Sequence, residues 1–148
     1  VVDAVAPRED ARATVRDAIG WVRELTGGAP QRISVSRTGR ALVAELATGG
    51  TVAAITLAIA GAGNEPWLDL VAMAATRVHV RVAPDLMARE VVHVGAEGRV
   101  VKPYRFEAGE RLALRRALAC LRSGGSDDRA ALRSDDLLAA ELCDGAWP

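Results

Sequence analysis

The change in hydrophobic period along the chain limits its fold most strongly. Residues 9–26 repeat apolar side chains at helical spacing, with Val15, Ile19 and Val22 on one stripe. From residue 31 to residue 106 the apolar side chains mostly alternate instead, which is typical of strands. The helical period returns over 109–125 and in the last stretch before Gly145. One helix, a run of strands and two helices in this order predict an α+β fold.

Seven segments have strand character, at 31–37, 40–48, 51–61, 67–73, 76–83, 89–94 and 99–106. Short turns join several of them, and Thr48-Gly49-Gly50-Thr51 has the composition of a hairpin turn. We therefore expect a mainly antiparallel sheet of about six strands. The helices should pack on one face, with Leu112, Leu114, Leu118 and Leu121 directed inward and Ser134 capping the last helix.

The second face of this sheet is expected to be open and apolar. Segment 51–61 is apolar on both sides apart from Thr56, which predicts a central strand covered on both faces. Three helices suffice for one face only. The face that the helices leave uncovered would then be an apolar surface of small residues, which suits contact between two copies of the chain. We therefore expect a homo-oligomer formed through the open sheet.

Length and composition exclude several classes of protein. The 148 residues suit a single domain, with 1–8 expected as a flexible lead-in. The 19 basic and 19 acidic side chains cancel, which disfavours nucleic acid and anionic membrane surfaces as partners. Residues 52–62, the longest apolar run, are too short to span a bilayer, and the N-terminal residues lack a signal-peptide pattern. Cys120 and Cys143 have neither metal nor redox spacing, so we expect reduced thiols in a cytoplasmic protein.

Three stretches resemble, in the same order, the C-terminal domain of the Gfo/Idh/MocA family of glucose-fructose oxidoreductases and inositol dehydrogenases. They are VRDAIGWVRELTGGAPQRISVS, GGTVAAITLAIAGAGNEPWLDLVAMAATRVHV and RRALACLRSGG with RSDDLLAAELCDGA. The resemblance implies a substrate-binding and oligomerisation domain. In that family the opening helix carries Asp-x-Gly-x-His-x-x-Asp, whose His is the acid/base of hydride transfer.

The corresponding stretch here, DARATVRD, keeps Asp10 and Asp17 but has Arg12 for the Gly and Thr14 for the His. A Thr hydroxyl does not titrate near neutral pH, so Thr14 cannot replace the imidazole. The chain also has no Gly-x-Gly-x-x-Gly turn to hold a dinucleotide. We therefore expect no cofactor and no autonomous NAD(P)-dependent dehydrogenase.

Two groups of side chains are candidates for a site. Asp10, Thr14 and Asp17 share one helical face and could line a remnant ligand pocket. Arg77, His79 and Arg81 alternate along one strand and could hold an anion. The Asp127-Asp128 and Asp135-Asp136 pairs lack the spacing of a calcium loop, so no metal is expected.

The leading hypothesis is a binding and assembly module without redox chemistry. It would dimerise through its open sheet or pair with a full-length, Rossmann-containing dehydrogenase. One alternative is a small cofactor-independent isomerase, cyclase or lyase that uses Asp17, His79 or Tyr104 for acid/base work. Another is a fragment of a complete NAD(P)-dependent oxidoreductase whose remaining part holds the cofactor.

Overall fold

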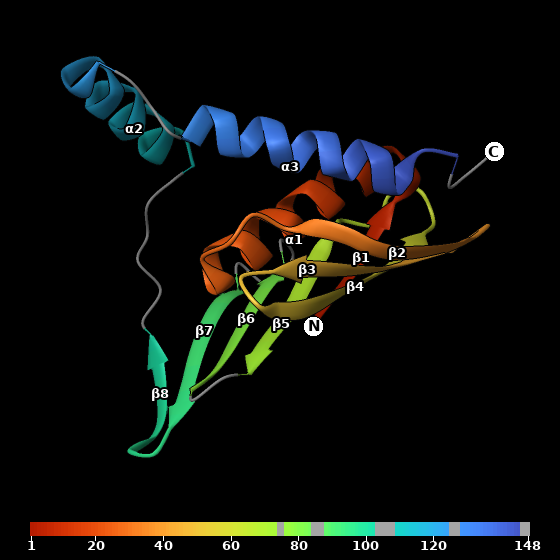
Figure 1. Ribbon diagram of the computed structural model, residues 1–148, viewed down its shortest axis with the longest axis horizontal. Coiled ribbons are helices and arrows are strands. Elements are labelled where there is room, and N and C mark those ends of the chain that lie inside the picture. Colours follow the sequence, from red (N-terminus) through yellow and green to blue (C-terminus); the bar gives the residue numbers. More distant parts are fainter. Residues whose placement is uncertain (74–75, 84–87, 103–108, 125–127, 146–148) are drawn as a thin grey trace.

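The computed structural model describes residues 1–73, 76–83, 88–102, 109–124 and 128–145 (Figure 1). Strands and helices are grouped along the chain: one strand and one helix are followed by seven strands and then by two helices. In chain order they are β1 (Val2–Pro7), the 3-10 turn η1 (Arg8–Asp10), α1 (Ala11–Thr26), β2 (Gln31–Thr38), β3 (Ala41–Thr48), β4 (Thr51–Ala60), β5 (Trp67–Met73), β6 (Arg77–Ala83), β7 (Ala88–Gly95), β8 (Gly98–Lys102), α2 (Gly109–Ser123) and α3 (Asp128–Cys143).

The eight strands form one sheet in the order β2-β3-β4-β1-β5-β6-β7-β8. Every neighbouring pair is antiparallel except β1 and β4, which run parallel. The predicted α+β class and the antiparallel character of the sheet are therefore confirmed. The sheet is larger than the six strands expected, and it is mixed.

Strand β1 accounts for much of that difference and corrects the prediction for the N-terminal residues. The flexible lead-in expected over 1–8 is wrong for Val2–Pro7, which lie between β4 and β5 in the middle of the sheet. Val2, Ala4 and Ala6 are buried, while Asp3 is exposed. No turn signal links Val2–Pro7 to a neighbouring strand, so the sequence alone does not show which strands this segment pairs with.

The core lies between α1 and one face of the sheet. Alternate residues of β3 and β4 are buried there, as the period of two requires, together with the apolar stripe of α1. The members with no exposed surface include Val15, Ala18, Ile19, Leu42, Ala44, Leu46, Ile55 and Leu57. The prediction that β4 is covered on both faces is wrong within the single chain, because Val52 and Ala58 on its other face are exposed.

The helices form an outer stack rather than a layer of three. Helix α1 lies against the sheet, and α3 lies across the outside of α1 and touches β2 (Figure 1). Arg37 of β2 donates to the backbone oxygens of Leu142 and Glu141 at distances of 2.8 and 3.0 Å and so joins α3 to the sheet edge. Ala139 and Leu142 of α3 are buried in the same core.

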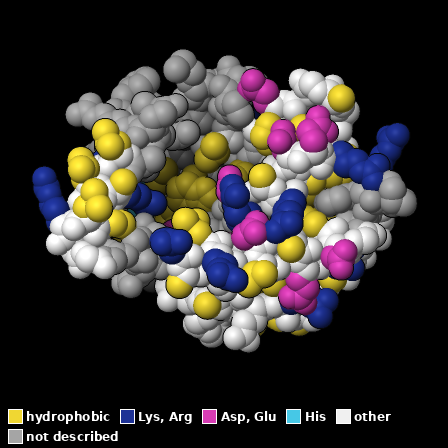
Figure 2. Space-filling model, turned by 90° about the horizontal axis from the view of Figure 1, so that it is seen from above, with side chains coloured by type: hydrophobic (Ala, Val, Ile, Leu, Met, Phe, Trp, Pro, Cys, Tyr) yellow, Lys and Arg dark blue, Asp and Glu magenta, His cyan; other side chains and the backbone are white. Residues whose placement is uncertain are grey.

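Helix α2 departs most from expectation. Leu114, Leu118 and Leu121, expected to point inward, are exposed, and Leu112 has no described side chain. Figure 1 shows α2 beside the start of α3 and away from the sheet. Figure 2 looks down on this side, with hydrophobic side chains gathered at the α2 end and along a hollow beside it. Ser134 does not cap α3, which begins six residues earlier at Asp128.

The predicted hairpin turn is confirmed. Thr48 and Thr51 are partners in the β3–β4 ladder, and Gly49 and Gly50 have φ angles of 53° and 81°. Two consecutive residues with positive φ make the tight turn whose twist matches that of the flanking strands. In the described part of the chain, no helix is both long and apolar enough to cross a membrane.

Candidate functional site

The helix residues that match the dehydrogenase pattern do not converge on a pocket. Thr14 is buried, with 5% of its surface exposed, and its hydroxyl donates to the backbone oxygen of Asp10 at 3.0 Å. Asp17 is exposed and accepts hydrogen bonds from the guanidinium of its neighbour Arg16 at 3.0 and 3.2 Å. The Thr14 hydroxyl is thus used within the helix, while Asp17 faces solvent.

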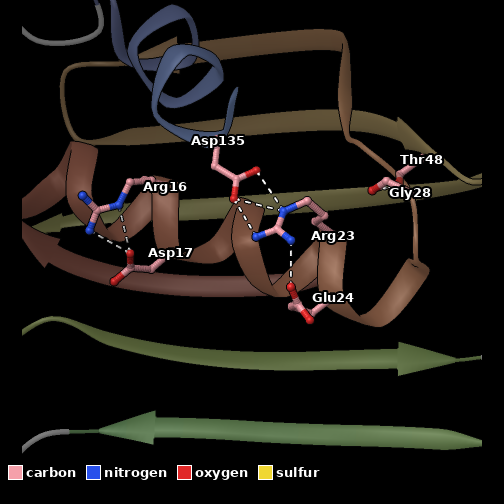
Figure 3. A network of polar contacts seen from close by, with 7 residues as sticks. All are labelled: Arg16, Asp17, Arg23, Glu24, Gly28, Thr48 and Asp135. Carbon is pink, nitrogen blue, oxygen red and sulfur yellow. Dashed lines mark hydrogen bonds and ion pairs between the residues drawn. The ribbon is translucent and has the colours of Figure 1, made fainter. Parts of the chain in front are cut away.

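A buried ion pair joins α1 to α3. Asp135, with 2% of its surface exposed, accepts from Nε and Nη2 of Arg23 at 3.1 to 3.3 Å (Figure 3). Glu24 binds the remaining end of the same guanidinium at 2.7 Å. The hydrogen bond to Asp135 raises the pKa of Arg23 above its ordinary value. This arrangement holds two helices together and leaves neither charge available for chemistry.

The cation row predicted on β6 lies on the open face of the sheet, but it is not purely cationic. Asp69 of β5 lies beside it, and its Oδ1 is 2.6 Å from Nε2 of His79. Both side chains are about one-third exposed, at 31% and 34%. Arg77 and Arg81 occupy positions two residues away on either side of His79, so they share its face. An anion at this row would compete with Asp69 for His79.

Asp3 adds a second carboxylate to this region. It is the cross-strand partner of Asp69, and on its other side it is the partner of Thr56. Like charges directly opposite on a sheet repel each other. Among the described residues, Asp3 forms no ion pair, and neither do Arg77 and Arg81. The open face therefore carries unpaired charges of both signs.

The open face also exposes large hydrophobic side chains. Large hydrophobic side chains on five of its strands are exposed by 38 to 77%. They are Val43 of β3, Val52 of β4, Met73 of β5, Val94 of β7 and Val101 of β8. The ladder partners place all five on the face that carries Asp69 and His79. This set is called the open-face hydrophobics below.

Two hollows of the described surface lie away from the predicted site residues. The larger, of about 440 Å³, lies where α1 ends over the edge of β4, β1 and β5, and its wall includes Val22, Leu25, Ala53 and Leu70. The smaller, of about 360 Å³, lies beside α3 and is lined by Arg12, Ala140, Glu141, Cys143 and Asp144. The described residues that line the larger hollow carry no acidic or basic side chain, and most of them are apolar.

Tyr104 lies outside the described residues. Among the residues that the structure describes, no three His, Cys, Asp or Glu side chains come together in a way that could hold a metal. Cys120 and Cys143 are free thiols, and burial raises the pKa of Cys143, which makes its reactive thiolate scarcer at neutral pH.

Sequence reasoning missed Asp3 and Asp69, and it considered Asp135 only as a calcium ligand and not as the partner of Arg23. Asp69 alternates with Leu68 and Leu70 and so was recognisable as an outward residue, but its partner His79 is set by the pairing of β5 with β6. Asp3 fell in the segment expected to be flexible. Comparison of the chain with models of known families, with curated proteins and with solved structures finds no match.

Proposed function

We propose that this chain is a non-redox assembly module whose two copies associate through the open face of the sheet. The proposal rests on one observation, the open-face hydrophobics, which are exposed on five strands of a single continuous sheet. A sheet face that exposes large apolar side chains on several strands is a candidate binding surface.

The size of the face fits such a role. Strands lie about 4.8 Å apart and rise about 3.3 Å per residue, so eight strands of about seven residues make a face of roughly 38 by 23 Å. A stable interface covers about 800 Å² on each partner. One side of the sheet is therefore large enough for a standard interface, while α1 and α3 already occupy the opposite side.

The resemblance of the sequence to the C-terminal domain of sugar-type dehydrogenases agrees with this role, since that domain serves assembly as well as substrate binding. Thr14 in place of the acid/base His supports a module without hydride-transfer chemistry. A Rossmann-containing relative is the other partner that the resemblance suggests, and it would compete for the same face.

A second candidate function is supported by the Asp69–His79 pair. A carboxylate 2.6 Å from one imidazole nitrogen orients the ring and leaves its other nitrogen available as a general base. This is the arrangement that a small cofactor-independent isomerase or lyase would need, and it stands on the open face rather than in a pocket.

The assembly proposal is tested by placing a charge on the open face. Met73 is 77% exposed, so Met73→Glu does not disturb the monomer, whereas in a symmetric dimer it introduces two buried charges. Leu137→Glu, at a leucine 62% exposed on α3, is the matched control. In sedimentation velocity at micromolar concentration we expect dimers for the wild type and Leu137→Glu and monomers for Met73→Glu.

A wild-type chain that sediments as a monomer across this range would refute the assembly proposal. Purification of the wild type bound to a dehydrogenase, with no self-association, would support the heterologous partner instead. Met73→Glu must retain the far-ultraviolet circular dichroism spectrum of the wild type for its result to count.

A further inference from the structure

The larger hollow lies in line with β1. The ladder between β1 and β4 begins with Val2 opposite Ile55, so β4 extends past the start of β1 by Thr51–Ala54. On the other side Val2 stands opposite Leu70, and β5 continues through Val71–Met73. The hollow of about 440 Å³ is lined by residues of both strand ends and by the end of α1. We call this hollow, with the backbone edges of Thr51–Ala54 and Val71–Met73, the β1 slot.

The backbone of β5 is oriented to pair with a strand in the β1 slot. The nitrogen of Val71 donates to the backbone oxygen of Val1 at 2.9 Å, and the Val1 nitrogen donates to the oxygen of Val71 at 2.8 Å. Alternate residues of a strand direct their backbone groups to the same side. The N–H and C=O of Met73, two residues further along, therefore also point toward the line of β1.

The wall formed by β4 follows the same rule. The nitrogen of Ile59 donates to the backbone oxygen of Arg40 at 2.9 Å, next to the end of the β3–β4 ladder. The odd-numbered residues of β4 therefore pair with β3, and the even-numbered residues, which include Val52 and Ala54, direct their backbone groups to the β1 side. Two facing strand edges of this kind match the backbone of an extended polypeptide, as in strand addition.

The side chains around the β1 slot define what such a polypeptide should carry. Val2 is buried and Val1 is 61% exposed, so the side chains of β1 alternate between the core face and the open face. A residue joined before Val1 would point to the core face, where Val22 and Leu25 of α1 line the hollow. The residue before that one would point to the open face, beside Met73. The matching pattern, counted back from Val1, is one apolar side chain and then one polar side chain.

We propose that the β1 slot is a strand-addition site, which holds three residues joined to the nitrogen of Val1 as a continuation of β1. The register of β1 and β4, continued backward, sets Val1 opposite Ala54 and the three joined residues opposite Ala53, Val52 and Thr51. They span about 10 Å at the rise of a strand. The joined segment runs parallel to β4 and antiparallel to β5, as β1 does.

The place of β1 in the sheet gives this site its role. Strand β1 lies between β4 and β5, so a segment that continues it is paired on both sides rather than on one. Polypeptide joined at Val1 is then fixed to the centre of the sheet through backbone hydrogen bonds. The site does not depend on assembly through the open face.

The test extends the chain at Val1 and observes each wall separately. The variant with Ser-Thr-Val joined before Val1 places its valine on the core face. The matched control, Ser-Val-Thr, has the same composition with the two faces exchanged. A second control, Ser-Thr-Pro, removes the backbone donor next to Val1, which a central strand does not tolerate. Hydrogen exchange measured by nuclear magnetic resonance follows the amide protons of Ala54 on β4 and Met73 on β5, and thermal unfolding is measured on the same samples.

The Ser-Thr-Val extension should slow the exchange of both amide protons at least about tenfold relative to the wild type, because each gains a strand partner. It should also raise the melting temperature by about 3 °C or more, since apolar surface is buried under the end of α1. The Ser-Val-Thr extension should stabilise the fold less, and Ser-Thr-Pro should leave both exchange rates unchanged.

Unchanged exchange at Ala54 and Met73 in the Ser-Thr-Val variant overturns the proposal, and so does equal stabilisation by all three extensions. The separate peptide acetyl-Ser-Thr-Val-amide, added to the wild type at millimolar concentration, distinguishes the source of the strand. Protection of both amide protons by this peptide, without protection in the extended chain, overturns attachment through Val1 and assigns the β1 slot to the chain of a partner.

Discussion

At the scale of single residues, polar side chains in this protein act mainly as connections between elements. Arg23 and Asp135 join α1 to α3, and Arg37 joins β2 to the end of α3. A buried carboxylate is costly unless a cation and hydrogen bonds accompany it. Asp135 has both from Arg23, so the pair works as one unit, and its members should not contribute independently to stability.

We predict unequal costs for breaking this pair. Arg23→Met leaves a carboxylate with 2% exposure unpaired and should lower the free energy of unfolding by about 3 kcal/mol or more. Asp135→Asn keeps an acceptor and should cost about 1–2 kcal/mol, since Arg23 can still reach Glu24. The double variant should cost less than the sum by about 1–3 kcal/mol. Urea unfolding of the four proteins measures the cycle, and strictly additive costs would contradict a coupled pair.

At the scale of elements, the close approach of two turns determines how α1 is joined to the sheet. The Thr48 hydroxyl lies 2.8 Å from that of Thr26 and donates to the backbone oxygen of Gly28 at 2.9 Å. A Cβ on Gly28 would stand 2.8 Å from the backbone nitrogen of Gly49, closer than real Cβ contacts. The loop after α1 therefore fits the β3–β4 turn only with glycine at this position.

Gly28→Ala should consequently destabilise the fold by about 1–3 kcal/mol, because neither backbone can move without disturbing the other. Gly39→Ala is the control, since its Cβ meets nothing within 4 Å and its φ is not in the left-handed region. That variant should be neutral or stabilised by up to about 1 kcal/mol. Thermal unfolding compares the two, and equal midpoints would show that the turns can separate freely.

At the scale of the whole molecule, the described fold is one-sided: a large sheet carries its helices on a single face (Figure 1). The covered face holds the core, and the other face exposes both apolar and charged residues. A dimer made through that face would complete the burial that the single chain leaves unfinished. Its stability would then depend on chain concentration, because dissociation accompanies unfolding.

We therefore predict that the wild-type melting temperature rises with concentration. Each tenfold increase stabilises a dimer by about 1.4 kcal/mol, which corresponds to roughly 2 °C for two chains of 148 residues. Met73→Glu should melt at one temperature throughout. Scanning calorimetry over a hundredfold range provides the comparison, and a concentration-independent wild type would argue against coupled assembly.

The sequence by itself determined what depends on neighbours in the chain. The helix over α1, the β3–β4 turn and the alternation in β3 follow from spacing and from Gly49-Gly50, because backbone geometry translates these patterns directly into local structure. The shared face of Arg77, His79 and Arg81 followed for the same reason, since alternate residues of a strand point the same way.

Only the tertiary structure decided which segments meet. It inserted Val2–Pro7 between β4 and β5, paired Asp69 with His79 and Arg23 with Asp135, and left α2 away from the sheet. Some of these contacts join residues that are far apart along the chain, and the others depend on the order of the strands in the sheet. Hydrophobic period does not encode that choice, because many strand orders bury the same apolar faces.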